Sequence, residues 1–127
     1  MKIVIDSNVF VSSFFWGGNP KEVFERVING LDELFISDAI IEEITSVMGS
    51  SKFNVNGDEI EDYVEIISKY SKNISVFISR DQNDNKIIQC AVDGNVDYII
   101  TGDKDLLVLS NYESIKIMNP KDYLKLV

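Results

Sequence analysis

The stretch Lys2-Ile3-Val4-Ile5-Asp6-Ser7-Asn8 decides how the rest of this sequence is interpreted. Ile3, Val4 and Ile5 form an unbroken apolar run, which is typical of a strand buried on both faces of a parallel sheet. An acid, Asp6, follows the run directly, with two small polar residues after it. A carboxylate at the carboxyl end of such a strand lies where open α/β sheets bind their ligands. An Asp in this position can equally cap a following helix, so the stretch needs a second such site to support it.

The composition is that of an ordinary globular protein, and we expect one domain over residues 1–127. No segment approaches the ~20 apolar residues that span a bilayer, and no basic and then apolar leader is visible. We therefore expect a cytoplasmic protein without a membrane partner. The one cysteine, Cys90, lies among apolar residues and is expected to be a small core residue.

Two absences and the net charge narrow the chemistry. The chain has no histidine, which excludes Ser-His-Asp and Cys-His catalysis and histidine-ligated zinc. It also lacks a glycine-rich phosphate-binding loop, which disfavours nucleotide-cofactor folds. The net charge of −9 argues against unaided binding of nucleic acid, because phosphates require neutralisation by cations. A cluster of acids that holds a divalent metal ion would still allow a nucleic-acid substrate.

Strand and helix patterns alternate along the chain. The expected strands cover residues 3–5, 34–36, 74–78, 97–101 and 115–117. The expected helices cover residues 20–29, 38–48 and 58–72, a helix opened by the polar stretch 79–86 and ended by Gly94, and a last helix opened by Asn119-Pro120. This alternation predicts an α/β fold, a three-layer α/β/α sandwich with a central parallel sheet of about five strands.

The predicted helix over residues 38–48 carries two adjacent glutamates that helical geometry separates. At about 100° per residue, its apolar side chains centre near Ile44. Glu42 then points about 160° away, into solvent, whereas Glu43 lies only about 100° away, at the margin of the buried stripe. Glu43 is therefore the better candidate for a site, and Glu42 the better candidate for a surface residue.

Further acids cluster late in the chain. The fourth strand resembles the first, since it ends in Thr101-Gly102-Asp103-Lys104-Asp105. If the first and fourth strands are neighbours where the strand order reverses, Asp6 meets Asp103 at one edge of the sheet. Asp84 could join from the polar loop and Glu43 from its helix. The other reading of Asp81 or Asp84 is a helix cap, because acids near a helix amino terminus are stabilised there.

Several carboxylates that meet without histidine or arginine cannot all stay ionised unless a cation joins them. Hard oxygen ligands in an open arrangement suit Mg²⁺ or Mn²⁺, and such ions promote displacement at a phosphodiester. The polar residues beside the acids, Ser7, Asn8 and Thr101, are suited to hold the carboxylates or to orient a water molecule.

These blocks resemble the PIN domain in their order along the chain, and in particular the branch of VapC-type toxins. The blocks are Asp6-Ser7-Asn8-Val9, Glu42-Glu43-Ile44, Arg80-Asp81-Gln82-Asn83-Asp84-Asn85-Lys86 and Thr101-Gly102-Asp103-Lys104-Asp105-Leu106-Leu107. The resemblance implies cleavage of RNA with Mg²⁺ or Mn²⁺. The catalytic and metal-binding acids that it implies are Asp6, Glu43, Asp84 and Asp103, with Ser7, Asn8, Asp81, Thr101 and Asp105 in supporting positions.

The sequence departs from the pattern of the family at three places. Ser7 stands where threonine is commoner, Gln82-Asn83 replaces a usual Pro-Asp pair, and Gly49-Ser50-Ser51 replaces a more basic turn. The lost basic turn and the acidic total bear on RNA binding more than on the chemistry.

The sequence is also compatible with two other functions. A phospho-receiver domain has a similar sheet and carboxylate pocket, but it needs a phosphoacceptor Asp after the third strand and a Lys after the fifth. A PIN-fold module that binds or helps process RNA without catalysis is the other. The resemblance also implies a small antitoxin protein as partner, and we expect a homodimer. The aromatic residues Phe10, Phe14, Phe15 and Trp16 are equally suited to such an interface and to the core.

Overall fold

A computed structural model describes residues 1–74 and 85–127 of the chain. Its strands are β1 (Lys2–Ile5), β2 (Glu33–Ile36), β3 (Ser71–Asn73), β4 (Tyr98–Ile100), β5 (Asn111–Tyr112) and β6 (Ile115–Met118). Its helices are α1 (Ser7–Trp16), α2 (Gly18–Ile28), α3 (Asp38–Met48), α4 (Gly57–Lys69), α5 (Lys86–Gly94), α6 (Lys104–Leu107) and α7 (Pro120–Leu126).

The strands form one sheet in the order β3-β2-β1-β4-β6-β5. All neighbouring strands are parallel except β5, which pairs with β6 in the antiparallel sense at the edge. The predicted α/β fold is thus confirmed, although the described sheet has six strands instead of about five and is mixed. The additional strand β5 is only two residues long, too short to leave a pattern in the sequence.

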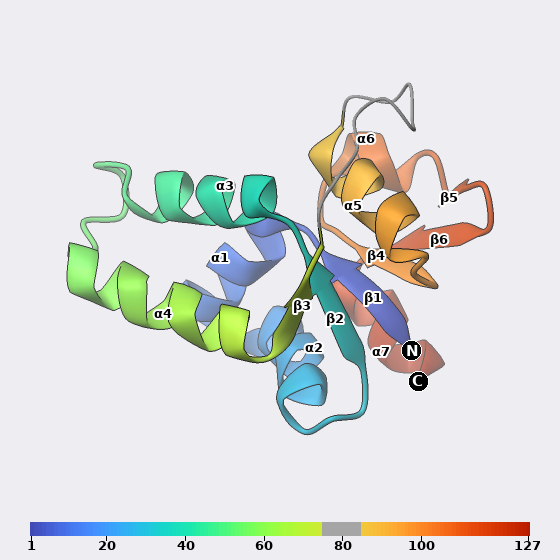
Figure 1. The fold of residues 1–127 in the computed structure, drawn as a ribbon, viewed down its shortest axis with the longest axis horizontal. Helices are drawn as coiled ribbons and strands as arrows, with labels where there is room; N and C mark the ends of the chain where they lie inside the picture. Colours follow the sequence, from blue (N-terminus) through green and yellow to red (C-terminus); the bar gives the residue numbers. More distant parts are fainter. Residues whose placement is uncertain (75–84) are drawn as a thin grey trace.

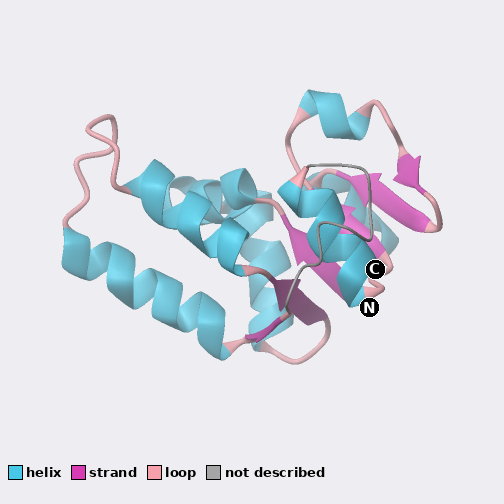
Figure 2. Ribbon diagram, turned by 45° about the horizontal axis from the view of Figure 1, so that its top comes forward, coloured by secondary structure: helices cyan, strands magenta, loops and turns pink. Residues whose placement is uncertain are grey.

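Helices cover both faces of this sheet (Figure 1). Helix α5 packs in front of β1, β2 and β4, while α2 and α7 lie behind. The rings of Tyr98 in β4 and Tyr123 in α7 are 5.4 Å apart, which fixes α7 against the sheet. Helices α3 and α4 pack on each other and extend away from the sheet to one side in both views (Figures 1 and 2). None of the described helices is long and apolar enough to cross a membrane.

The central strand β1 is buried on both faces, as its sequence predicts. Ile3, Val4 and Ile5 are almost completely inaccessible to solvent, because β2 and β4 flank the strand and helices cover it. Cys90 in α5 is fully buried, and burial raises the pKa of its thiol to about 12. Its role as a small core residue is thereby confirmed.

One predicted boundary is wrong, and it concerns a short polar segment. The helix expected over residues 58–72 ends at Lys69, and Ser71–Asn73 instead form β3, hydrogen-bonded to β2. This edge strand is mostly exposed and polar, so it carries no apolar pattern. Of the strand expected over residues 74–78, positions 75–78 lie outside the described residues.

The aromatic run is a helix that the sequence analysis did not assign. Residues Ser7–Trp16 form α1, and Gly17 and Gly18 with positive φ angles of 69° and 63° turn the chain directly into α2. Glycine adopts this conformation without the steric cost that other residues incur. Helix α2 therefore begins two residues before Pro20, the predicted first residue.

A buried acid, Asp32, joins α2 to the start of β2. Its Oδ2 accepts a hydrogen bond of 2.8 Å from Nε of Arg26, and its Oδ1 lies 3.3 Å from the amino group of Met1. Burial raises the pKa of the Asp32 carboxyl, but its hydrogen-bonded and charged neighbours, Arg26 foremost and the terminal amino group among them, together more than offset this, and the net pKa is lowered. The ionised carboxylate is thus favoured by folding.

We predict that Asp32→Asn lowers the free energy of unfolding at pH 7 by about 2–3 kcal/mol, because it breaks a charged pair in which the carboxylate is buried and the Arg26 side chain partly so. A lowered pKa in the folded state stabilises the protein above the ordinary pKa of 3.8, and this contribution is lost as the pH falls through the folded pKa. The difference from the wild type should therefore shrink in acid. Urea unfolding across pH measures it.

The matched control is Glu33→Gln, which removes the same charge from the exposed neighbouring residue and should change stability little. Equal losses in the two variants at pH 7 would contradict the role given to the buried pair.

Candidate active site

The carboxyl ends of β1 and β4 lie side by side at the point where the strand order reverses. Ile5 pairs with Ile100, and the backbone N–H of Asp6 donates to the carbonyl of Ile100 at 2.9 Å. The neighbours β2 and β6 lie on opposite sides of this central pair. Such a switch point is where open α/β sheets form ligand sites.

Thr101 connects two of the predicted acids through its buried hydroxyl. Its Oγ1 donates to Oδ2 of Asp6 at 2.7 Å and accepts from the backbone N–H of Asp103 at 3.0 Å. Asp103 in turn caps α6, since its Oδ1 accepts from the backbone N–H of Asp105 at 2.9 Å. A threonine at this position therefore fixes both carboxylate-bearing residues relative to the sheet.

Asp6 is held in an environment that opposes its charge. The residue is only 6% exposed, and its side chain caps no helix N–H, although it precedes α1. Burial raises the pKa of its carboxyl, and the negative charges of Glu43 and Asp103 raise it further, against the hydrogen bonds from Thr101 and the backbone of Ser7. The net shift is upward. An ionised Asp6 therefore costs folding free energy unless a cation is added.

The two glutamates of α3 differ in exposure as the helical geometry predicts. Glu42 is exposed, whereas Glu43 is partly buried at the margin of the core. Oε2 of Glu43 forms an ion pair with Nζ of Lys86, the first residue of α5. Lys86 is a residue for which the sequence analysis assigned no role. The sequence feature that could have pointed to Lys86 is a cation in the first turn of a helix, where the helix dipole disfavours a positive charge.

The supporting residues are divided by the structure. Ser7 is fully buried in the first turn of α1, and its Oγ has no hydrogen-bond partner among the described residues. Asn8 and Asp105 are exposed. Asp81 and Asp84 lie outside the described residues, so the fourth predicted metal ligand has no described position.

The side chains among the described residues have the chemistry to bind a hard divalent cation, but they do not form a complete metal site. Within residues 1–74 and 85–127, no three acidic side chains are close enough to hold one ion between them. The available donors are nevertheless all oxygens, namely the carboxylates of Asp6, Glu43 and Asp103 and the unpartnered hydroxyl of Ser7. A buried hydroxyl without a partner needs water or an ion, and an all-oxygen set is what Mg²⁺ and Mn²⁺ require.

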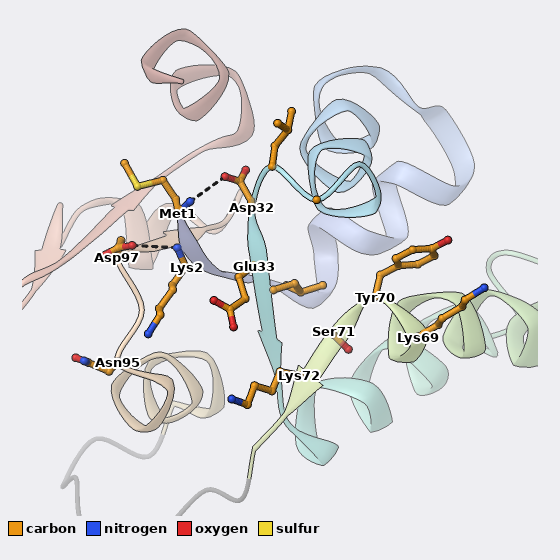
Figure 3. Close-up of a pocket in the computed structure, with 13 residues that line it drawn as sticks. Met1, Lys2, Asp32, Glu33, Lys69, Tyr70, Ser71, Lys72, Asn95 and Asp97 are labelled. Carbon is orange, nitrogen blue, oxygen red and sulfur yellow. Dashed lines mark hydrogen bonds and ion pairs between the residues drawn. The ribbon is translucent and has the colours of Figure 1, made fainter.

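A pocket of about 860 Å³ lies at the opposite edge of the sheet (Figure 3). Its lining includes Lys2, Glu33 and Asp97, which precede or begin strands, and Lys72 of β3. Because the strands are parallel, these residues are separated from Asp6 and Thr101 by the length of β1 and β4. The residues that line this pocket are not part of the site formed by the predicted acids. The lining carries both positive and negative charges, so it does not indicate a particular class of ligand.

A smaller apolar groove of about 510 Å³ lies among α1, α2 and α4. Trp16 at its rim is 71% exposed, and Ile28 and Ile66 are also exposed. By contrast, Phe10 is buried in the core, and Phe14 and Phe15 are partly buried against it. The aromatic run therefore serves both the core and the surface, and exposure increases from Phe10 to Trp16 at its end.

We predict that Asp6→Asn raises the melting temperature of the metal-free protein at pH 7, because it removes a charge that burial and two acids oppose. A raised pKa means that the wild type loses stability as pH rises through it, so the difference should vanish in acid. For a chain of this size, 1 kcal/mol corresponds to roughly 4 °C. Thermal unfolding in EDTA measures the shift.

Asp62→Asn on the exposed face of α4 serves as the control for simple charge removal. A melting temperature of Asp6→Asn at or below that of the wild type would mean that the carboxylate stabilises the empty fold.

Comparison with known proteins gives a family match and matches to solved structures. A family model described as "PIN domain" matches residues 2–105. In fold, the chain is similar to a chain of the VapBC2 complex from Rickettsia felis, whose structure was determined bound to a DNA fragment from the promoter of the pair. That match has a TM-score of 0.64 and 13% sequence identity, and it covers 94% of this chain and 98% of the other. No curated protein matches the sequence.

The structural match supports the fold alone, because the identity is low. The family match spans both terminal motif blocks, Asp6-Ser7-Asn8 and Thr101-Gly102-Asp103, which the structure brings to one edge of the sheet. It also excludes the phospho-receiver reading, since the blocks belong to another family. The chain is a member of the PIN domain family.

Proposed function

We propose that this protein is an endoribonuclease that cleaves RNA phosphodiester bonds with Mg²⁺ or Mn²⁺. The observation that carries the proposal is the hydrogen-bonded connection of Asp6, Thr101 and Asp103 at the switch point of a PIN-domain sheet. Carboxylates concentrated there, with one of them buried against its charge, need a cation. We further propose that residues 1–127 act as one nuclease domain in the cytoplasm.

Asp6, Glu43 and Asp103, with Asp84, are the residues that would hold the metal. A bound divalent ion supplies charge neutralisation and activation of water for attack at phosphorus. Thr101 keeps Oδ2 of Asp6 oriented by donating its hydroxyl proton, and through the N–H of Asp103 it keeps the second acid in register. The hydroxyl of Ser7, which has no hydrogen-bond partner among residues 1–74 and 85–127, can orient a water molecule at the start of α1.

We also propose that the protein is the toxin of a toxin–antitoxin pair and that its antitoxin binds the apolar groove. Beside the groove, α4 exposes a row of acids. They are Asp58, Glu59, Glu61, Asp62 and Glu65. An apolar groove next to an acidic helix is complementary to an amphipathic segment with basic flanks. The similarity in fold to a chain of a VapBC2 complex supports a partner of this kind. We propose that the toxin forms a homodimer, which light scattering can measure.

The proposed activity predicts a sharp difference between two neighbouring residues. Glu43→Gln should weaken Mn²⁺ binding and reduce RNA cleavage at least tenfold, because it removes a charged ligand. Glu42→Gln, which points into solvent on the same helix, should leave both unchanged. Asp6→Asn should abolish cleavage while the fold is retained. Calorimetric Mn²⁺ titration and cleavage of a structured RNA at fixed Mg²⁺ measure these effects.

Equal effects of the two glutamate substitutions would show that helix α3 does not present Glu43 to the site. Full activity of Asp6→Asn at equal Mg²⁺ would leave a PIN-fold module that binds RNA without catalysis as the better description.

The proposed antitoxin groove predicts that Trp16→Ala weakens binding of the antitoxin at least tenfold, since aromatic residues are enriched among the residues that dominate binding at interfaces. Val108→Ser is the matched control, because Val108 is 81% exposed but does not line the groove. Titration of the purified partner measures both affinities. Unchanged binding by Trp16→Ala, with Val108→Ser equal to it, would place the partner elsewhere.

A further inference from the structure

Lys86 forms an ion pair with an acid of the proposed metal site. Its Nζ pairs with Oε2 of Glu43 across the contact between α5 and α3. Both side chains are partly exposed, so solvent and a diffusing ion can reach the pair. Among residues 1–74 and 85–127, no other cation forms an ion pair with Asp6, Glu43 or Asp103.

Helix α5 itself does not require a lysine at position 86. A cation in the first turn of a helix is disfavoured by the positive end of the helix dipole. The local capping is provided by Asn85, whose side chain accepts from the backbone N–H groups of Ile87 and Ile88 at 2.9 and 3.2 Å. The ammonium is therefore not needed to start α5, and its partner lies on another helix.

The negative charges at the carboxyl ends of β1 and β4 suggest a function for the Lys86 ammonium group. Glu43 and Asp103 both oppose ionisation of buried Asp6, and among the described residues Lys86 is the one cation ion-paired with any of these three acids. A positive charge paired with Glu43 reduces the repulsion when no metal is present. The same charge also repels a divalent cation that approaches the carboxylate, by an energy that falls with distance and with salt.

We propose that Lys86 is a built-in counter-ion that holds Glu43 in the metal-free protein and competes with the divalent ion for this carboxylate. The proposal rests on the proposed function, in which Glu43 binds the metal. Lys86 is then a positioning residue whose effect on metal affinity is exerted through Glu43. Its removal tightens metal binding, whereas a purely structural lysine would on removal leave binding unchanged or weaken it.

The test is Mn²⁺ titration by calorimetry on the wild type, Lys86→Met, Lys86→Arg and Lys104→Met. We expect Lys86→Met to bind Mn²⁺ about threefold to tenfold more tightly at low salt, with a smaller gain at high salt. Lys86→Arg keeps the charge and should behave as the wild type. Lys104 begins α6 between Asp103 and Asp105, so Lys104→Met removes an equal charge close to the site without breaking the Glu43 pair.

A double-mutant cycle isolates the pair itself. In the Glu43→Gln background, Lys86→Met should no longer change Mn²⁺ affinity, and in EDTA the two substitutions should be non-additive in melting temperature. If the wild type binds Mn²⁺ and Lys86→Met binds it with equal or lower affinity, the role of Lys86 as a counter-ion is wrong, while the metal site remains supported. The same holds if Lys104→Met gives an equal gain. No binding by the wild type or by any lysine variant overturns both the site and the counter-ion.

Discussion

The buried hydrogen bond from Thr101 to Asp6 is the interaction on which the site depends. It joins the ends of β1 and β4, which are far apart in sequence, through two buried residues at 2.7 Å. Parallel pairing of these strands brings the two residues to the same height in the sheet, and the hydroxyl then fixes one carboxylate oxygen. Because the same oxygen of Thr101 accepts the N–H of Asp103, one side chain determines where both acids lie.

The geometry that assembles the acids also opposes folding of the metal-free chain. Asp6 is removed from water and faces two further negative charges, so its ionised form is unfavourable. Two local interactions offset part of this cost: Thr101 donates a hydrogen bond to the buried carboxylate of Asp6, and Lys86 forms an ion pair with the partly exposed Glu43. Functional sites commonly retain such unfavourable electrostatics, because a site that is already neutral has little affinity for a cation.

The proposed catalytic residues and the proposed partner-binding groove lie on separate parts of the molecule. The acids gather at the carboxyl edge of the sheet, whereas the apolar groove lies among α1, α2 and α4. Helix α1 links them, because it begins with Ser7 beside Asp6 and ends with exposed Trp16. A partner segment bound along the groove therefore contacts an element that also carries part of the site.

The sequence by itself determined the α/β class, the buried strand at residues 3–5, the boundaries of α3 and the orientation of Glu42 and Glu43. These features are local, since hydrophobic periodicity and helix geometry act within a few residues. Only the tertiary structure decided the edge strand β3, the ion pair of Asp32 with Arg26 and the pairing of Lys86 with Glu43. Each of these depends on which elements become neighbours in the fold. A polar edge strand and an ion pair between elements involve no apolar periodicity, so the sequence pattern does not predict them.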